Sequence, residues 1–323
     1  MRAVAAGLTD VGLQRDHNED SFAILQDHEL YIVADGMGGH RAGDVASKLA
    51  TEAIVDFFRA TAAEDFTWPF HFDARMSEEE NRLLTGIKIA NRQIVERSSR
   101  SRECHGMGTT VVGALFSGKK GKMYIGHVGD SRAYRVRGGE IRQMTRDHSL
   151  VNDYLLAMPE LTEEQKSELP KNVITRALGM QEHVNVDLQG DDASVGDCYV
   201  LCSDGLSGMI EDTEILEIVS RAGNIEEACR RLIAVANEHG GEDNITAVLV
   251  RIVEEPGGGE KVSLSDTLPT PLTARLRQGP GSAGPNTEPL PPPMPPASAP
   301  TAPEAPLDAH ADTPPAGDTK PKE

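Results

Sequence analysis

The sequence of 323 residues lacks several features, and each absence excludes a class of protein. It contains no run of about 18 consecutive apolar residues, so no membrane-spanning helix is expected. The N-terminal segment Met1–Leu8 is too short and too soon interrupted to predict a signal peptide. Positive charge is scarce: 32 Lys and Arg stand against 51 Asp and Glu, and the net charge of −19 argues against a general nucleic-acid-binding protein.

Cysteine is also rare, and the four residues form neither a C-x-x-C pair nor a zinc-ligand spacing. Two of them, Cys198 and Cys202, bracket an apolar run. We interpret these two, together with Cys104 and Cys229, as small buried hydrophobic residues. Because this use of cysteine fits a reducing compartment, we expect a cytoplasmic protein.

Proline is nearly absent from residues 1–253, which hold three of the 20 prolines, whereas residues 254–323 hold 17. Apolar residues have the opposite distribution, so residues 1–253 are expected to form one domain around a sizeable core. Residues 254–323, rich in Pro, Gly and Ala, are predicted to be a disordered tail with polyproline-II character. We favour a solvated spacer for this tail over a docking arm.

Local patterns predict an α+β protein. Runs rich in β-branched residues predict strands over Ser21–Gln26, Glu29–Ala34, Thr110–Phe116, Met123–Val128, Ala133–Arg137, Cys198–Ser203 and Ile245–Ile252. Helical periodicity predicts helices over Asp44–Ala60, Ser77–Arg97, Glu211–Ala222 and Asn224–His239. Glycine turns at Gly118–Gly121 and Gly138–Gly139 predict antiparallel hairpins. We therefore expect sheets packed on each other with helices outside.

Two of the apolar runs end in Asp-Gly, at Asp35 and at Asp204. A single such pair is most often an ordinary turn. Further acidic clusters at 18–20 and 242–244 make this explanation insufficient, because no matching set of Lys or Arg accompanies the four sites. A carboxylate at the edge of a core is costly unless it is paired or binds a metal. Carboxylate ligands without His or Cys favour magnesium or manganese over zinc.

Arg15 lies five residues before Asp20 in an acidic loop. Alone, such an arginine is usually a solvated ion-pair partner, but beside a carboxylate-held metal its guanidinium can bind two phosphate oxygens. The glycine loop at 36–39 follows a strand, as a dinucleotide-binding loop does. We reject that interpretation because Arg41 fills the third glycine position and Asp35 would repel a pyrophosphate.

Six motifs occur in a fixed order: Arg15-x-x-Asn18-Glu19-Asp20, Val33-Ala34-Asp35-Gly36-Met37-Gly38-Gly39, Gly106-Met107-Gly108-Thr109-Thr110, Val128-Gly129-Asp130-Ser131-Arg132, Ser203-Asp204-Gly205 and Glu242-Asp243-Asn244. Because it carries these motifs in this order, the chain resembles bacterial members of the protein phosphatase 2C family, the metal-dependent serine/threonine phosphatases. The resemblance extends from about residue 5 to residue 252.

The resemblance implies a four-layer α-β-β-α sandwich, in which two mainly antiparallel sheets are flanked by helices. A centre of two manganese or magnesium ions is expected at one end. By the matching motifs, Asp35 would bridge both ions, and the Gly36 carbonyl, Asp204 and Asp243 would complete their ligands.

The resemblance assigns roles to further residues around this centre. Asp20 would bind one ion directly, and Glu19 would act mainly through bound water. Asp130 resembles a residue that, with Asp204, supports a third, weaker ion. Asn244 would orient its neighbour Asp243 without binding metal itself. Arg15 would hold the substrate phosphate.

Two ions about 3.5–4 Å apart make a bridging water acidic enough to supply hydroxide near neutral pH. We expect this hydroxide to attack phosphorus in line, while the ions and Arg15 stabilise charge on the equatorial oxygens. The chain has no C-x5-R nucleophile loop, which agrees with a mechanism without a phosphoenzyme.

Eukaryotic relatives carry a histidine directly after the Asp-Gly pair, as a candidate general acid, whereas this chain has Met37. His40 is either an alternative acid or, as we favour, a histidine that fixes the glycine turn. We interpret His148 as structural. The segment Leu150–Lys171 lies where the family places a flap, and we expect an exposed helix and loop there.

The leading hypothesis is a monomeric enzyme that hydrolyses phosphoserine and phosphothreonine in proteins and so opposes serine/threonine kinases, with the kinases and their substrates as partners. An inactive relative that only binds phosphoproteins is a second hypothesis. It is disfavoured because all four metal carboxylates are present: Asp20, Asp35, Asp204 and Asp243. A dedicated regulator acting on one anti-sigma antagonist is a third, although such proteins usually carry a sensory domain before the catalytic part.

Overall fold

The structure of the chain is a computed structural model. The structure describes residues 1–38, 42–62, 67–158, 160, 162, 165, 169–170 and 173–255. All of them belong to one compact unit, Met1–Pro271. Residues 256–323, which form nearly all of the predicted tail, lie outside the described residues.

Two antiparallel sheets form the centre of this unit. The first contains, in spatial order, β1 (Arg2–Asp10), β11 (Ile245–Val253), β10 (Cys198–Cys202), β7 (Arg132–Arg137) and β8 (Glu140–Gln143). The second contains β2 (Asp20–Leu25), β3 (Leu30–Met37), β5 (Val111–Ser117), β6 (Lys122–Val128) and β9 (Asp187–Asp192), and the short β4 (Gly108–Thr109) pairs with β3. Every sequence-predicted strand is present.

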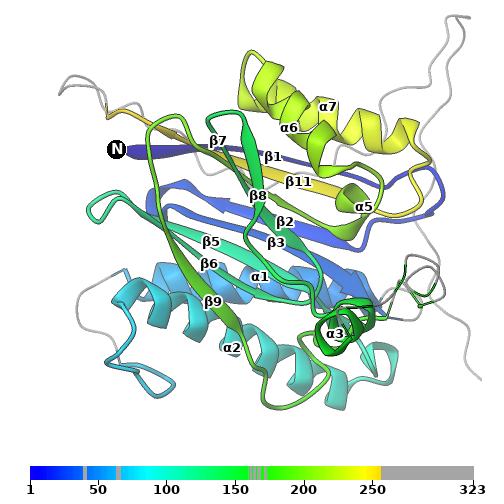
Figure 1. The fold of residues 1–323 in the computed structure, drawn as a ribbon. Coiled ribbons are helices and arrows are strands. Elements are labelled where there is room, and N and C mark those ends of the chain that lie inside the picture. Colours follow the sequence, from blue (N-terminus) through cyan, green and yellow to red (C-terminus); the bar gives the residue numbers. More distant parts are fainter. Residues whose placement is uncertain are drawn as a thin grey trace, which may run out of the picture. The chain divides into compact units, whose positions relative to one another are not determined.

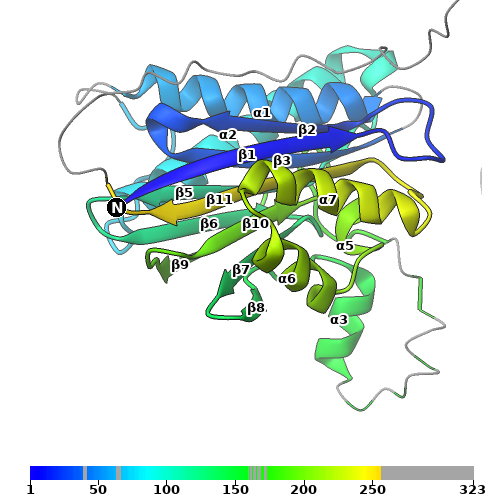
Figure 2. The same cartoon turned by 90° about the horizontal axis from the view of Figure 1, so that it is seen from above.

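Helices cover the outer face of each sheet, as Figures 1 and 2 show. The long helices α1 (Ala42–Ala60) and α2 (Glu78–Arg100) lie on the second sheet, and α6 (Asp212–Arg221) and α7 (Ile225–Glu238) lie on the first. Shorter elements are α3 (Leu150–Ala157), α5 (Asp204–Ser207) and 3-10 turns at Gln26–His28 and Arg102–Cys104. The predicted α-β-β-α sandwich is confirmed.

The four layers follow from alternation along buried strands. In β3, Leu30, Ile32 and Ala34 pack toward α1 and α2, whereas Tyr31 and Val33 pack between the sheets. Because successive strand side chains point to opposite faces, a strand covered on both sides is apolar throughout. This explains why β3 appears in the sequence as a continuous apolar run rather than an alternating one.

Local signals place the ends of several elements. The Ser77 hydroxyl accepts the Glu80 N–H at 3.2 Å and a Glu80 carboxylate oxygen accepts the Ser77 N–H at 2.8 Å, which forms a capping box at the start of α2. Between β7 and β8, Gly138 and Gly139 have φ of 58° and 85°, as a two-residue hairpin turn of type I′ requires.

Several elements were not predicted from the sequence. Strand β1 is rich in alanine and β9 is acidic, so neither has the composition of a strand. Both form because a neighbouring strand provides partners for their backbone hydrogen bonds. β1 pairs with β11 over nine residues, and β9 pairs with β6 over six. Helix α3 lies in the predicted flap and has no buried residue. None of the described helices is long and apolar enough to cross a bilayer.

Candidate metal centre

Two of the predicted metal ligands lie opposite each other in the second sheet. Asp20 begins β2, Asp35 lies near the end of β3, and the antiparallel register pairs these two residues directly. Such directly opposed like charges repel, and a sheet retains them only where something compensates. Their position therefore favours a cation at this edge of the sheet.

The other predicted carboxylates come from the first sheet. Asp204 starts α5 and is separated from β10 by Ser203 alone, and Asp243 precedes β11, which pairs with β10. The two sheets are joined at this point by hydrogen bonds to Asp20. The hydroxyls of Ser203 and Thr246 donate to Asp20 Oδ2 at 2.8 Å and 2.6 Å. Strand ends from both layers thus bring the four carboxylates together.

The electrostatics of this group favour neutralisation. Burial, together with the charges of Asp204 and Asp243, raises the pKa of Asp20 to about 8. Burial is also the main reason that the pKa of Asp35 is raised well above its usual value, and the charges of Asp20 and Asp204 add to the effect. The pKa of Asp204 is raised, again chiefly by burial. Without a bound cation, this cluster resists full ionisation.

Buried oxygens without a protein partner test whether metal ions fit. Among the described residues, Asp20 Oδ1, Asp130 Oδ1 and Asp204 Oδ1 are buried and accept no hydrogen bond. Asp130 is the predicted ligand of a weaker third ion, and burial with the Asp204 charge raises its pKa to about 7. Unsatisfied buried carboxylate oxygens are costly unless they coordinate a cation. Oxygen-only donors suit hard divalent ions, so the residues fit manganese or magnesium.

Two glycines let the backbone segments of the site approach each other. A Cβ at Gly36 would lie 2.1 Å from the Gly43 carbonyl oxygen. A Cβ at Gly205 would lie 2.1 Å from the Asn244 carbonyl oxygen. A side chain at Gly36 would push β3 away from the start of α1, and one at Gly205 would push α5 away from the segment of Asp243 and Asn244, which explains the glycine after each aspartate in physical terms.

Arg15 and Asn244 surround Asp243. Arg15 Nη2 donates to Asp243 Oδ2 at 2.7 Å, and its side chain is 53% exposed, so it can meet a ligand from solvent. The backbone N–H of Asn244 donates to Asp243 Oδ1 at 2.8 Å. The Asn244 side chain accepts the Glu19 N–H at 2.7 Å and donates to the carbonyls of Val11 and His17. Asn244 therefore ties the loop before β2 to the loop before β11.

The Glu19 side chain is partly buried, and burial raises its pKa. Its Oε1 lies 3.3 Å from His17 Nε2. His40, which the sequence offers as an alternative acid or as a histidine that fixes the glycine turn, lies outside the described residues.

Sequence reasoning missed a set of hydroxyls that position the carboxylates. Besides Ser203 and Thr246, the Thr110 hydroxyl accepts the Asp35 N–H at 3.1 Å and lies 2.6 Å from the Ser131 hydroxyl. Ser131 follows Asp130, so Thr110 connects the two carboxylate-bearing segments. The signal was present, because Thr110, Ser131 and Ser203 each lie within the motifs, but their partners are distant in sequence.

Fold and site together define an α+β sandwich protein with a carboxylate centre suited to divalent cations and an arginine at its rim. A model of the family described as protein phosphatase 2C matches residues 14–250. The chain belongs to that family, the metal-dependent serine/threonine protein phosphatases, as the motifs predict.

Individual relatives agree with this assignment. The serine/threonine phosphatase stp of Listeria welshimeri is 39% identical over 246 residues, which cover 75% of this chain and 93% of that protein. The protein phosphatase PhpP of Streptococcus pneumoniae is 36% identical over 256 residues, covering 77% and 97%.

Solved structures are equally similar. The serine/threonine phosphatase PstP/Ppp of Mycobacterium tuberculosis has a TM-score of 0.68 at 34% identity and covers 79% of this chain and 100% of its own. A catalytic domain of PstP described in complex with two manganese ions has a TM-score of 0.66 at 34% identity, with coverage of 78% and 99%.

Proposed function

We propose that the chain hydrolyses phosphoserine and phosphothreonine in proteins with the help of two manganese or magnesium ions held at this centre. The observation that carries the proposal is a group of four carboxylates, two from each sheet, that lie close enough for their charges to raise one another's pKa, with buried oxygens on Asp20 and Asp204 that accept no hydrogen bond. Arg15 places a positive charge beside this group, because its guanidinium pairs with Asp243.

Asp35, Asp204, Asp243 and the Gly36 carbonyl would hold the two ions. Asp20 would contribute one oxygen only, because Ser203 and Thr246 occupy its Oδ2. Glu19 would act through water, and Asp130 would support a weaker third ion. Bound divalent ions supply Lewis-acid stabilisation of a phosphoryl group and a more acidic water.

The protein's own residues orient the reactants. Arg15 reaches solvent with one N–H on Asp243, and its other N–H groups can bind two oxygens of a phosphate monoester. Asn244 fixes Asp243 from the adjacent backbone, and the Ser203 and Thr246 hydroxyls fix Asp20. These contacts hold the carboxylates in place before substrate arrives, which reduces reorganisation during the reaction.

The substrates that we propose are proteins phosphorylated by serine/threonine kinases, the kinases included. We further propose that the enzyme acts as a monomer in the cytoplasm. The four cysteines are all unpaired and buried, which supports a reducing compartment.

The test is hydrolysis of p-nitrophenyl phosphate and of a phosphothreonine peptide with manganese, with EDTA, and by the variant Asp204→Asn. We expect manganese-dependent turnover of both substrates that is lost with EDTA and in the variant. Asp56→Asn, the same change at an exposed position of α1, is the matched control and should retain full activity. Folded wild-type protein that binds the phosphopeptide without turnover would instead support the inactive phosphoprotein-binding relative.

A further inference from the structure

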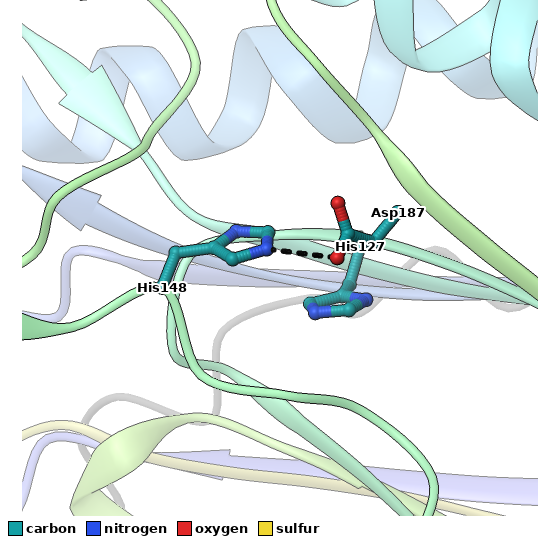
Figure 3. Close-up of side chains that lie close together, drawn as sticks. All are labelled: His127, His148 and Asp187. Carbon is teal, nitrogen blue, oxygen red and sulfur yellow. Dashed lines mark ion pairs between the residues drawn. The ribbon is translucent and has the colours of Figure 1, made fainter. Parts of the chain in front are cut away.

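A second cluster of ionisable side chains lies outside the carboxylate centre. It contains His127 of β6, His148, Arg176 and Asp187 of β9, and Figure 3 shows the two histidines beside Asp187. The rings of His127 and His148 stack with centroids 4.8 Å apart and planes 13° apart. The His148 side chain is 2% exposed, so its ring meets protein groups rather than bulk water.

Two histidines and a carboxylate are also a donor set typical of a transition metal. The contacts argue against one here. Arg176 Nη1 lies 2.6 Å from Asp187 Oδ1 and 3.0 Å from His148 Nε2, so a permanent cation already occupies the position between them. His127 Nε2 lies 2.8 Å from the Arg146 carbonyl oxygen, and in-plane nitrogens of nearly parallel stacked rings do not converge on one ion. The protein supplies the cation itself.

The hydrogen bonds define where the proton of His148 lies. The Gly129 N–H donates to Nδ1 at 3.0 Å, so Nδ1 carries no proton. A neutral ring then bears its proton on Nε2, which lies 3.4 Å from Asp187 Oδ2. Arg176 Nη1 needs no acceptor on His148, because its two hydrogens meet Asp187 Oδ1 and the Asn185 carbonyl. Both ring nitrogens of His148 thus have a defined role.

His148 connects three backbone segments. Its N–H donates to the Gly129 carbonyl at 3.0 Å, in addition to the bond that Gly129 makes with its ring. Its carbonyl accepts the Thr175 N–H at 2.8 Å, and the next residue, Ser149, pairs with Ile174. Residues 148–149 and 174–175 are the two ends of the segment that contains α3, so His148 joins both ends to the turn at Gly129.

The turn at Gly129 carries Asp130, and it is held from both sides. Gly129 has a φ of +109°, and a Cβ there would lie 2.6 Å from the Thr110 Cβ, so only glycine fits. Thr110 thus packs against one side of the turn, and on another side the His148 ring accepts the Gly129 N–H. If the His148 acceptor were lost, a buried backbone donor next to Asp130 would be unsatisfied.

We propose that His148, fixed by Asp187 and Arg176, is a positioning residue that holds the Asp130 carboxylate in place for the weaker metal ion. The proposal rests on the proposed function for the role of Asp130, but not for the contact between His148 and the turn. It makes the ends of the α3 segment and the third ion site parts of one hydrogen-bonded unit.

The first test uses metal-free, 15N-labelled protein and is independent of the proposed function. His148→Leu removes both ring nitrogens in a similar volume, whereas the Oδ1 of His148→Asn can accept from Gly129 as Nδ1 does. We expect exchange of the Gly129 amide hydrogen to become about tenfold faster in the Leu variant and to return toward the wild-type rate in the Asn variant. Equal exchange in all three proteins would overturn the proposal.

The second test measures manganese binding by electron paramagnetic resonance of the free ion. We expect His148→Leu to weaken the weakest site about 10- to 100-fold while the tighter sites are unchanged, with partial rescue by His148→Asn. Adding His148→Leu to Asp130→Asn should have no further effect on binding. An additive loss in the double variant, or a site lost in His148→Leu but present in Asp130→Asn, would overturn the proposal, the latter in favour of a metal at the histidines.

The outcomes for the proposed function are separate. If wild-type protein binds no manganese and hydrolyses neither substrate, the proposed function fails, and the exchange experiment still decides whether His148 holds the turn. If His148→Leu does not fold, Asp187→Asn changes the partly exposed partner of His148 instead. Faster exchange of the Gly129 amide hydrogen in this variant would support the proposal, and unchanged exchange would overturn it.

Discussion

Mild acid should destabilise the protein more than its variant His148→Leu, because His148 is buried in its neutral form. Burial, His127 and the Arg176 charge lower the pKa of His148 to about 4, against 6.5 for an ordinary histidine, although Asp187 acts in the opposite direction. Between these values the unfolded chain binds a proton that the folded protein excludes. The contribution of His148 to stability is therefore complete above about pH 6.5 and is lost as the pH falls toward 4.

The magnitude follows from the two pKa values. A difference of 2.5 units corresponds to at most about 3 kcal/mol over the whole range, and to about 2 kcal/mol between pH 7 and pH 5. The assay is urea unfolding of metal-free protein at several pH values, with the free energy of unfolding of the Leu variant subtracted from that of the wild type. Groups that do not contact His148 titrate alike in both proteins, so the difference reports on His148 and its immediate partners.

The expected result is a difference that shrinks by about 2 kcal/mol as the pH falls from 7 to 5. His71→Leu, which removes an exposed histidine outside the cluster, is the matched control. A difference between wild type and the His148 variant that does not depend on pH would refute the reasoning, because it would show that His148 is not held neutral by its surroundings.

Three further predictions concern the centre and the tail. Manganese at about 100 times its dissociation constant should stabilise the protein by about 2.7 kcal/mol and raise the melting temperature by roughly 5–10 °C in a thermal scan, and Asp204→Asn should abolish this shift. Gly205→Ala should lower manganese affinity and kcat by about 10- to 100-fold, because its Cβ would lie 2.1 Å from the Asn244 carbonyl oxygen. Gly190→Ala, where the nearest atom would be 3.6 Å away, is its control. A chain ending at Glu255 should hydrolyse p-nitrophenyl phosphate at the rate of the full chain, and a large loss of rate would contradict the interpretation of the tail as a spacer.

Strongly patterned elements could be predicted from sequence because their signals are local. The seven apolar runs and the four amphipathic helices have the required periodicity within one segment, and Ser77 with Glu80 marks where α2 begins. Strands β1 and β9 could not be predicted in this way. Their residues are not those of a typical strand, and each depends on a partner that is distant in the chain.

The same distinction between local signals and distant contacts applies to the candidate site. The sequence by itself determined the kinds of ligand, their order, and the glycines after Asp35 and Asp204, because each motif is a contiguous segment. Only the tertiary structure decided that Asp20 lies opposite Asp35, and that Ser203 and Thr246 from the other sheet bond to the same carboxylate.

The same holds for the histidine cluster. His148 lies in the polar stretch Thr145–Ser149, which is similar to a segment of the family, but nothing in its sequence neighbours indicates a partner. Its role follows from contacts with Gly129, 19 residues earlier, and with Arg176, 28 residues later. Contacts across such separations depend on strand register and packing, which arise from the whole core at once. A local pattern therefore states which chemistry a residue can perform, and the tertiary structure decides what that residue meets.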